Sequence, residues 1–356
     1  MKNITTLLVL ILFTAGMAVA QNNEADVTQN TNASEVNLDQ QGSSNDATVL
    51  QTRGQYHEAQ IQQIGNSNEL NLTQDNTNTF AEIDQLGDAN VAQIFQRSRL
   101  FRGPGNVASS IELTQDGDGN RANIRQDAEA GDGGAQTNIL SALQYGNDNY
   151  LNVDQNRDIG PGYNKAYVEQ YGDENTASVT QDGESNSVLV RQGEYGGSYN
   201  SVADFTQTGD GNYFETKQVR SYGNTVSGTQ EGDDNYYRAS VRGSDNTVTM
   251  DMLGDANFGS WSISSLGWPH QPADNELSID VVGSDNYSTG RIAGDNNTVT
   301  IMQYGEGNRI GTSWYTSDGV NIAGDFNTVS ISQQSDFNSA SVFVSGNGNS
   351  ATVTQN

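Results

Sequence analysis

Polar and apolar residues alternate along short stretches of the chain, and these stretches recur about every 11 residues. A clear copy is Asn297–Gln303, which reads Asn-Thr-Val-Thr-Ile-Met-Gln and is followed by Tyr-Gly-Glu-Gly and the next Asn, Asn308. Alternation with a period of two predicts a strand with one buried and one exposed face. The Gly and Asn that follow predict a tight turn, because Gly adopts positive φ without strain and Asn hydrogen-bonds its own backbone.

The unit can be followed from Asn23 through 28 copies, one of them a weak copy near Thr316. Counted from the opening Asn, positions 0, +2, +4 and +6 hold Asn, Ala or Val, a larger aliphatic residue and Gln, whereas the positions between them are mostly polar. We therefore expect the first set to face inward and the second to face water. Nearly every copy has its inward and outward residues at the same positions of the unit.

Two units, joined by two turns, make one coil of about 22 residues, so the sequence predicts about 14 stacked rungs. At ~4.8 Å per rung the stack would be roughly 65 Å long. The predicted fold is all-β, a β-solenoid of strand-turn-strand rungs whose hand the sequence does not specify. An antiparallel sandwich of 28 strands is the structural alternative, but a uniform 11-residue unit favours the stacking of like rungs.

Asn and Gln at inward positions are unusual for a core, because a buried amide without partners costs roughly 1–3 kcal/mol. Stacking supplies the partners, since the same amide lies one rung above and one rung below, as in the amide ladders of cross-β structures. The predicted ladder and turn residues are Asn45, Gln51, Asn68, Gln74, Gln85, Gly87, Asn90, Gln96, Gln115, Gly117, Asn120, Gln126, Gln144, Gly146, Asn149, Gln170, Gly172, Asn175, Gln181, Gly183, Asn186, Gln207, Gly209, Asn212, Gln303, Gly305 and Asn308.

The interior changes in the C-terminal part of the chain. From residue 241 onward the closing Gln is often replaced by an apolar residue, at Val241, Met252, Ile263, Val281, Ile292, Trp314, Ile322 and Val344. The large Trp261 stands at position +4, and the same slot two units before and after it holds Ala239 and Gly290. A large residue between small ones on adjacent rungs is typical of a close-packed interior.

The chain has 33% hydrophobic residues and a formal net charge of −28, values that also suit a disordered protein. The strict period argues against disorder. With 44 acidic and 16 basic residues, the chain is a poor partner for nucleic acid, whose phosphates need clustered cations. It has no Cys, so disulfides and thiolate metal sites are excluded.

Residues 1–20 are predicted to be a secretory signal peptide, with Lys2, an apolar centre at residues 7–13 and a small-residue cleavage site at Ala18-Val-Ala20. The mature chain has no further segment long enough to span a bilayer. Residues 21–356 then form a single repeat domain, with insertions near residues 97–108, 127–137, 156–163, 193–200, 264–274 and 315–321. The early insertions precede even-numbered units and the later ones odd-numbered units, which would place them on opposite edges.

The first unit follows the predicted cleavage site, and the last unit closes near the C-terminus. Monomeric solenoids carry capping elements with a polar outer face. We expect both terminal rungs, with Asn23 and Gln29 at one end and Asn349 and Gln355 at the other, to be uncapped and to pair with further copies. The sequence thus predicts head-to-tail polymerisation into fibres.

The pattern Asn-x-Ala-x-x-x-Gln-x-Gly-x-x-Asn resembles the curlin repeat of secreted curli subunits. Residues 40–51, Gln-Gln-Gly-Ser-Ser-Asn-Asp-Ala-Thr-Val-Leu-Gln, fit it position for position, as do residues 85–96 and 170–181. The resemblance extends over residues 23–356, with its strongest copies before residue 235. The chain departs from that family in its length and in the absence of a Gly/Asn-rich leader after the signal peptide.

The resemblance implies a secreted functional amyloid that forms adhesive extracellular fibres, of the pilus type, in the biofilm matrix at the bacterial cell surface. It implies three partners: other copies of the same chain in a homopolymer, a nucleator subunit and a dedicated outer-membrane secretion pore.

Candidate chemistry is sparse. His57 occupies a strand-opening position and His270 lies in the 264–274 insertion, and neither belongs to a recognisable catalytic motif, so the chain is not expected to be an enzyme. No cofactor is expected. Turns such as 116–120 and 232–235 offer oxygen ligands for calcium, but the nonapeptide of calcium β-rolls is missing and Asp, Asn and Gly are ordinary turn residues.

Two non-enzymatic alternatives keep the same fold. One is a monomeric cell-surface adhesin, which would use the insertions 97–108 and 264–274 as binding loops. The other is an ice-binding protein, which needs a flat outward array of Thr. The pairs Thr247/Thr249 and Thr298/Thr300 begin such an array, but acidic residues fill the same outward slots in other units.

Overall fold

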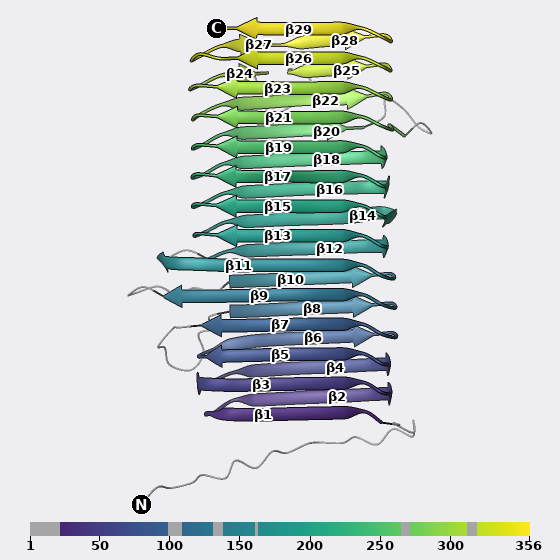
Figure 1. Cartoon of the computed structure of the whole chain (residues 1–356), viewed down its shortest axis with the longest axis vertical. Coiled ribbons are helices and arrows are strands. Elements are labelled where there is room, and N and C mark those ends of the chain that lie inside the picture. The colour runs from purple at the N-terminus through teal and green to yellow at the C-terminus, as the bar shows by residue number, and fades with distance from the viewer. Residues whose placement is uncertain (1–21, 99–108, 131–137, 161–162, 265–270, 312–318) are drawn as a thin grey trace, which may run out of the picture.

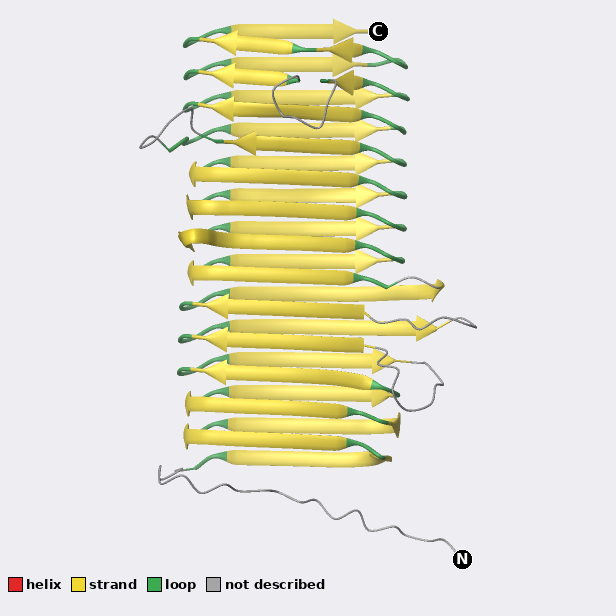
Figure 2. Cartoon of the chain, turned by 180° about the vertical axis from the view of Figure 1, so that it is seen from behind, coloured by secondary structure: helices red, strands yellow, loops and turns green. Residues whose placement is uncertain are grey.

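The computed structural model describes residues 22–98, 109–130, 138–160, 163–264, 271–311 and 319–356. All regular elements in this part of the chain are strands, and they stack along one axis into a flattened β-solenoid (Figures 1 and 2). No helix that could cross a membrane occurs among these residues. The predicted signal peptide, residues 1–20, lies outside them. The predicted all-β solenoid is confirmed.

The strands form two parallel sheets that face each other. Sheet 1 contains, in order, β1 (Glu24–Asn32), β3 (Asp46–Gln55), β5 (Glu69–Asn76), β7 (Val91–Ser98), β9 (Arg121–Ala130), β11 (Tyr150–Gly160), β13 (Thr176–Asp182), β15 (Val202–Thr208), β17 (Thr225–Glu231), β19 (Thr247–Leu253), β21 (Glu276–Val282), β23 (Thr298–Tyr304), β26 (Thr328–Gln333) and β29 (Ser350–Gln355). Sheet 2 contains β2 (Glu35–Ser43), β4 (Glu58–Asn66), β6 (Thr79–Leu86), β8 (Ser109–Asp116), β10 (Asn138–Tyr145), β12 (Lys165–Asp173), β14 (Ser187–Tyr199), β16 (Tyr213–Tyr222), β18 (Tyr236–Ser244), β20 (Phe258–Ile263), β22 (Tyr287–Ala293), β24 (Arg309–Ile310), β25 (Val320–Ala323), β27 (Ser339–Ala340) and β28 (Val342–Ser345).

Each strand pairs with the strand two units away, and the register matches position to position. In β23, Ile301 pairs with Ile279 below and Ile331 above, and Gln303 pairs with Val281 and Gln333. Burial alternates along β23 as predicted: Val299, Ile301 and Gln303 are buried, whereas the residues between them are partly exposed. The buried apolar side chains form one continuous core between the sheets. The period of the sequence therefore specifies both register and facing.

The count of 28 strand units is wrong by one. β24 and β25 both pair with β22, through Tyr287 with Arg309 and through Gly290 with Val320. They are two parts of one strand, and the weak copy near Thr316, which itself lies outside the described residues, is not a separate unit. β27 and β28 likewise share one position. Among the described residues sheet 1 thus has fourteen strand positions and sheet 2 has thirteen.

The strands that precede the predicted insertions belong to both sheets. β7, β9 and β11 of sheet 1 come before the first three, and β20 of sheet 2 comes before the 264–274 insertion, and the strands of the two sheets end at opposite edges (Figure 1). Parts predicted as insertions, such as residues 127–130 and 193–199, instead extend β9 and β14. The last predicted insertion, 315–321, interrupts one strand of sheet 2 and does not precede an odd-numbered unit, because Val320 already belongs to β25.

The predicted packing of Trp261 is confirmed. Its indole is buried, and the paired residues on the two adjacent rungs are Ala239 and Gly290. A Cβ added to Gly290 would lie 2.1 Å from Cζ3 of Trp261, so only glycine leaves room for the ring. The core is filled rung by rung, with large and small side chains in complementary positions.

Candidate functional site

Buried Gln amides at position +6 form a hydrogen-bonded ladder in each sheet. Nε2 of Gln181 donates to Oε1 of Gln207 at 2.9 Å, and Nε2 of Gln207 donates to Oε1 of Gln230 at 2.8 Å. Every such bond has its donor on the rung nearer the N-terminal end. The side-chain amides of a ladder therefore all point the same way along the axis.

The second N–H of each ladder Gln connects the two sheets. Nε2 of Gln181, in sheet 1, also donates to the backbone carbonyl of Lys165 in sheet 2, at 3.0 Å. Gln74 makes the same bond to Glu58, at 3.0 Å. Both amide hydrogens are thus used, so a fully buried Gln costs little here. The two sheets are held together by amide bonds as well as by apolar contact.

The opening Asn residues form a second set of ladders, which reach the turns. Oδ1 of Asn45 accepts from the backbone N–H of Asn68 at 3.0 Å and from Nδ2 of Asn68 at 3.1 Å. Nδ2 of Asn68 also donates to the carbonyl oxygen of Gly87, in the turn of the next rung, at 2.8 Å. Each Asn therefore binds one rung below and one rung above.

The turn glycines are required by this close stacking. Gly65 has a φ of +122°, and a Cβ built on it would lie 2.0 Å from the carbonyl oxygen of Gly87. That carbonyl is the acceptor for Asn68. A side chain at the glycine would therefore disturb both the turn and the Asn ladder.

The structure brings the predicted ladder residues into continuous columns. Gln29, Gln51, Gln74, Gln96, Gln126, Gln155, Gln181, Gln207 and Gln230 follow one another in sheet 1, and Gln40, Gln63, Gln85, Gln115, Gln144, Gln170, Gln192 and Gln218 in sheet 2. Asn23, Asn45, Asn68, Asn90, Asn120, Asn149 and Asn175 form the opening column of sheet 1, each accepting the backbone N–H of the next. The opening column of sheet 2 includes Asn186, Asn212 and Asn308.

The Gln columns are interrupted where apolar residues replace the amide. In sheet 2 the amides end at Gln218, and Val241 takes the next position. In sheet 1 Met252 and Val281 interrupt the column, which resumes with Gln303, Gln333 and Gln355. Oε1 of Gln303 lies over Val281, and it is buried without a hydrogen-bond partner. Trp314, predicted for this set, lies outside the described residues.

The terminal strands of the described solenoid, β1 and β29, each pair with one strand only. Gln29 and Gln355 are partly exposed, unlike the buried Gln residues between them. Within the described residues Oε1 of Gln29 has no donor, and Nδ2 of Asn23 is buried without a partner. The described solenoid therefore presents unused amide groups at both of its ends.

The two ends are complementary. The N-terminal face offers Oε1 of Gln29 and of Gln40 as acceptors, because the Nε2 atoms of both donate toward the next rung. The C-terminal face offers the remaining N–H of Gln355, whose Oε1 accepts from Gln333 at 2.8 Å and whose Nε2 donates once, to Ser339. Donors at one end thus match acceptors at the other.

His57 fills the opening position of its unit, as predicted. Its Nε2 lies 3.0 Å from the carbonyl oxygen of Arg53 and its Nδ1 lies 2.8 Å from Oγ1 of Thr79. The carbonyl needs a donor, so Nε2 carries the proton and Nδ1 accepts. Burial lowers the pKa of His57, so the folded chain keeps the ring neutral and loses stability as the pH falls below about 6.5. His270 lies outside the described residues.

The acidic turn residues are used within the turns. Oδ1 of Asp118 accepts the backbone N–H of Asp88 at 2.8 Å, and Oδ1 of Asp233 accepts that of Asp210 at 2.8 Å. Among the described residues no group of three or more His, Cys, Asp or Glu is arranged to hold a metal ion. Calcium binding at the turns 116–120 and 232–235 stays a prediction.

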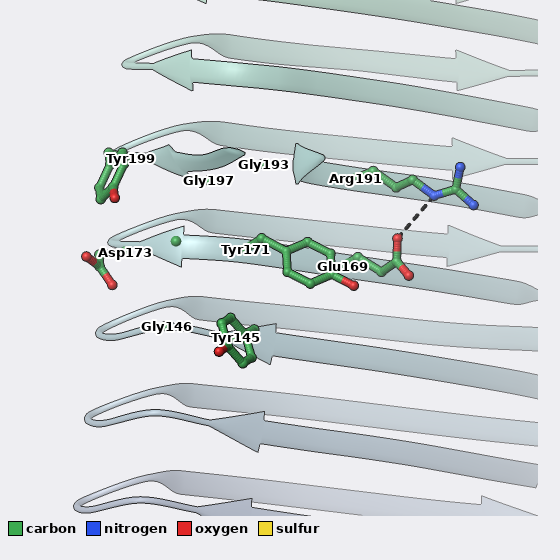
Figure 3. Close-up of a pocket in the computed structure, with 10 residues that line it drawn as sticks. Tyr145, Gly146, Glu169, Tyr171, Asp173, Arg191, Gly193, Gly197 and Tyr199 are labelled. Carbon is green, nitrogen blue, oxygen red and sulfur yellow. Dashed lines mark ion pairs between the residues drawn. The ribbon is translucent and has the colours of Figure 1, made fainter. Parts of the chain in front are cut away.

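A groove of about 700 Å³ lies on the outer surface where β10, β12 and β14 end (Figure 3). Tyr145, Tyr171 and Tyr199 line it, together with Glu169 and Arg191, whose side chains form an ion pair of 3.2 Å. Opposite charges that lie side by side on neighbouring strands, like these two, attract each other. The groove is a feature of the side of the solenoid, away from both ends.

The sequence reasoning missed an aromatic stack on the outer face of sheet 2. Tyr213, Tyr236, Phe258 and Tyr287 occupy position +1 of alternate units, and neighbouring rings lie 4.8–4.9 Å apart between centroids and nearly parallel. An aromatic residue at +1 in every second unit was the signal that could have revealed it. The stack adds aromatic contacts between neighbouring rungs on the outer face of sheet 2.

Comparison with protein families gives one match. The family described as the curlin associated repeat matches residues 31–65, 162–183 and 324–356. The third region shows that the repeat persists near the C-terminal end, beyond residue 235, before which the strongest copies were expected. No curated protein matches the chain.

Proposed function

Because the chain belongs to the curlin-repeat proteins, we propose that it is a secreted structural subunit that polymerises head to tail into curli-like amyloid fibres. The fibres would lie outside the cell and serve the biofilm matrix and surface adhesion. In this function no residue performs catalysis. The stacked amides, the apolar core and the two terminal rungs provide a mechanical activity, namely the extension of one continuous double sheet.

The observation that carries the proposal is the complementarity of the ends. β1 and β29 expose strand edges, and unpaired edges readily add further strands. The Gln40 acceptor at one end and the remaining N–H of Gln355 at the other continue the ladder polarity found inside the molecule. A second copy placed on the first repeats contacts that the chain already makes between its own rungs.

The acidic surface suits this arrangement. With a formal net charge of −28, neighbouring solenoids repel one another side by side, whereas the exposed strand edges are confined to the ends. Growth along the axis is therefore favoured over lateral clumping. A nucleator subunit and a secretion pore are further partners that we propose from the family.

The test is assembly itself. Residues 21–356, which contain every described strand, are purified in denaturant, diluted, and followed by thioflavin T fluorescence and fibre diffraction. We expect fibres with a reflection at about 4.7–4.8 Å along the axis. A stable monomer without that reflection would contradict the polymer and leave a monomeric surface adhesin as the function.

A matched pair of variants examines the ends. Val353→Pro, in β29, removes a backbone donor and distorts the terminal strand, so it should slow elongation several-fold. A proline in the 264–274 insertion should leave elongation nearly unchanged. Equal effects of the two substitutions on the elongation rate would count against docking through the terminal rungs.

A further inference from the structure

The two terminal strands of the described solenoid, β1 and β29, belong to the same sheet. This follows from the strand count, with fourteen positions in sheet 1 and thirteen in sheet 2. Since strands alternate between the sheets, an odd number of them begins and ends in sheet 1. The number of strands therefore limits how a second copy can be placed on the first.

Placement by translation alone leaves a defect. If β1 of the second copy were added to β29, sheet 1 would continue, but sheet 2 would lack one strand between β27/β28 and the incoming β2. The facing edges of these strands would be separated by about two strand spacings, roughly 9.6 Å. Their backbone N–H and C=O groups would remain unpaired at the junction.

A half-turn about the long axis removes the defect. The strands of the two sheets run in opposite directions, and a half-turn exchanges both the sheets and the directions. The turned copy places its β1 on β27/β28 and its β2 on β29, so that every strand remains parallel to its neighbour and none is missing. The 11-residue unit makes this possible, because both sheets are built from the same unit with the same inward positions.

We infer that successive copies in the fibre are related by a half-turn about the axis, so that sheet 2 of one subunit continues as sheet 1 of the next. This inference rests on the end-to-end assembly proposed above. It names the surface of each end: β27, β28 and β29 receive β1 and β2 of the next copy.

The side chains at this junction match by position. Gln40 of the second copy comes to lie on Gln355, which has an N–H left to donate, and Oε1 of Gln40 has no donor in the described residues. Asn23 comes to lie on Asn338, whose Oδ1 supplies an acceptor for the unpartnered Nδ2 of Asn23. The remaining core pair, Gln29 on Val344, repeats the arrangement of Gln303 on Val281 inside the molecule.

The test uses cysteine pairs, which is simple because the chain has no Cys. Outward residues at position +3 face each other on adjacent strands, with Cα atoms about 4.8 Å apart, a distance that a disulfide spans. The half-turn places Thr352 beside Asn37 of the next copy. Translation would place Thr352 beside Asp26 instead. The half-turn puts Asp26 on the opposite sheet, out of disulfide reach.

Fibres are grown from residues 21–356 carrying Thr352→Cys with either Asn37→Cys or Asp26→Cys, oxidised, dissolved in denaturant and run on non-reducing gels. We expect covalent oligomers from the Asn37→Cys pair and monomer from the Asp26→Cys pair. A control variant carries Ser330→Cys with Thr352→Cys, which are paired residues of β26 and β29 within one chain. Loss of the free thiols in this variant shows that oxidation is complete.

Oligomers from the Asp26→Cys pair, or monomer from both pairs in well-formed fibres, would overturn the half-turn while leaving the fibre function intact. Absence of fibres from the unsubstituted chain would remove the proposed function, and this inference with it.

Discussion

A glycine inside a strand, Gly290, makes room for the indole of Trp261 on the neighbouring rung. Both residues are at position +4, where most units carry a branched aliphatic residue. Such size exchange between rungs can be read from the sequence once the 22-residue coil is known, because the paired residues occupy the same position of the unit. The close approach of 2.1 Å for an added Cβ makes it testable.

Gly290→Ala should destabilise the fold by about 1–3 kcal/mol, because the added methyl group overlaps the indole ring of Trp261 and the packed core leaves the ring no room to move away. The measurement is urea unfolding of the freshly diluted chain, followed by far-UV circular dichroism. In a Trp261→Leu background the same substitution should cost clearly less. An equal cost in both backgrounds would show that the effect belongs to the glycine backbone and not to the ring.

Within a Gln column, the direction in which each side-chain amide points decides which hydrogen bonds that Gln makes. Gln207 both donates and accepts within its ladder, whereas Gln303 donates to Gln333 at 3.0 Å and has a buried Oε1 without a partner. Two residues of the same type, in the same sheet and at the same position of the unit, therefore differ in their hydrogen bonding. The difference arises from Val281 beneath Gln303.

Gln207→Leu should lower the free energy of unfolding by about 1–3 kcal/mol, since it leaves an unpaired acceptor on Gln230 and removes a partner of Gln181. Gln303→Leu should cost clearly less, because it removes an oxygen that is already unpaired and ends only the two bonds that Nε2 of Gln303 donates, to Gln333 and to the carbonyl oxygen of Tyr287. Urea unfolding of the two variants, measured side by side, gives the comparison. A larger loss of unfolding free energy for Gln303→Leu than for Gln207→Leu would show that hydrogen bonds within the ladder do not determine the cost.

The period predicted register, facing and the ladders, because all three depend only on which position of the unit a residue occupies. It could not predict that β24 and β25 are one strand. The stretch from Val320 to Ala323 looks like a separate short unit, and only its pairing with β22 places it. The polarity of the ladders was equally inaccessible, since the residue name Gln does not say which way its amide points.

For the whole chain, the parity of the strand count determines the symmetry of the proposed fibre. Removal of residues 349–356 takes away β29, so that the solenoid would begin in sheet 1 and end in sheet 2. A second copy could then be added by translation without a missing strand. The length of the repeat array, beyond its composition, thus controls how subunits face one another.

The truncated chain should therefore change its junction. Asp26 of the incoming copy would lie beside Ser330, so Asp26→Cys with Ser330→Cys should give covalent oligomers in truncated fibres and monomer in full-length fibres. Non-reducing gels of oxidised fibres provide the measurement, and thioflavin T fluorescence verifies assembly of both chains. Cross-linking of this pair in full-length fibres would contradict the dependence on parity.

The uniform direction of the Gln amides has a consequence for a growing polymer. Each side-chain amide carries a dipole, and in a ladder these dipoles add along the axis instead of cancelling. One tip of a fibre then ends in amide oxygens and the other in amide hydrogens, so the two tips meet arriving subunits with different rates of capture. A fibre attached to a cell by one tip would always show the medium the same opposite tip, and its growth would have a direction.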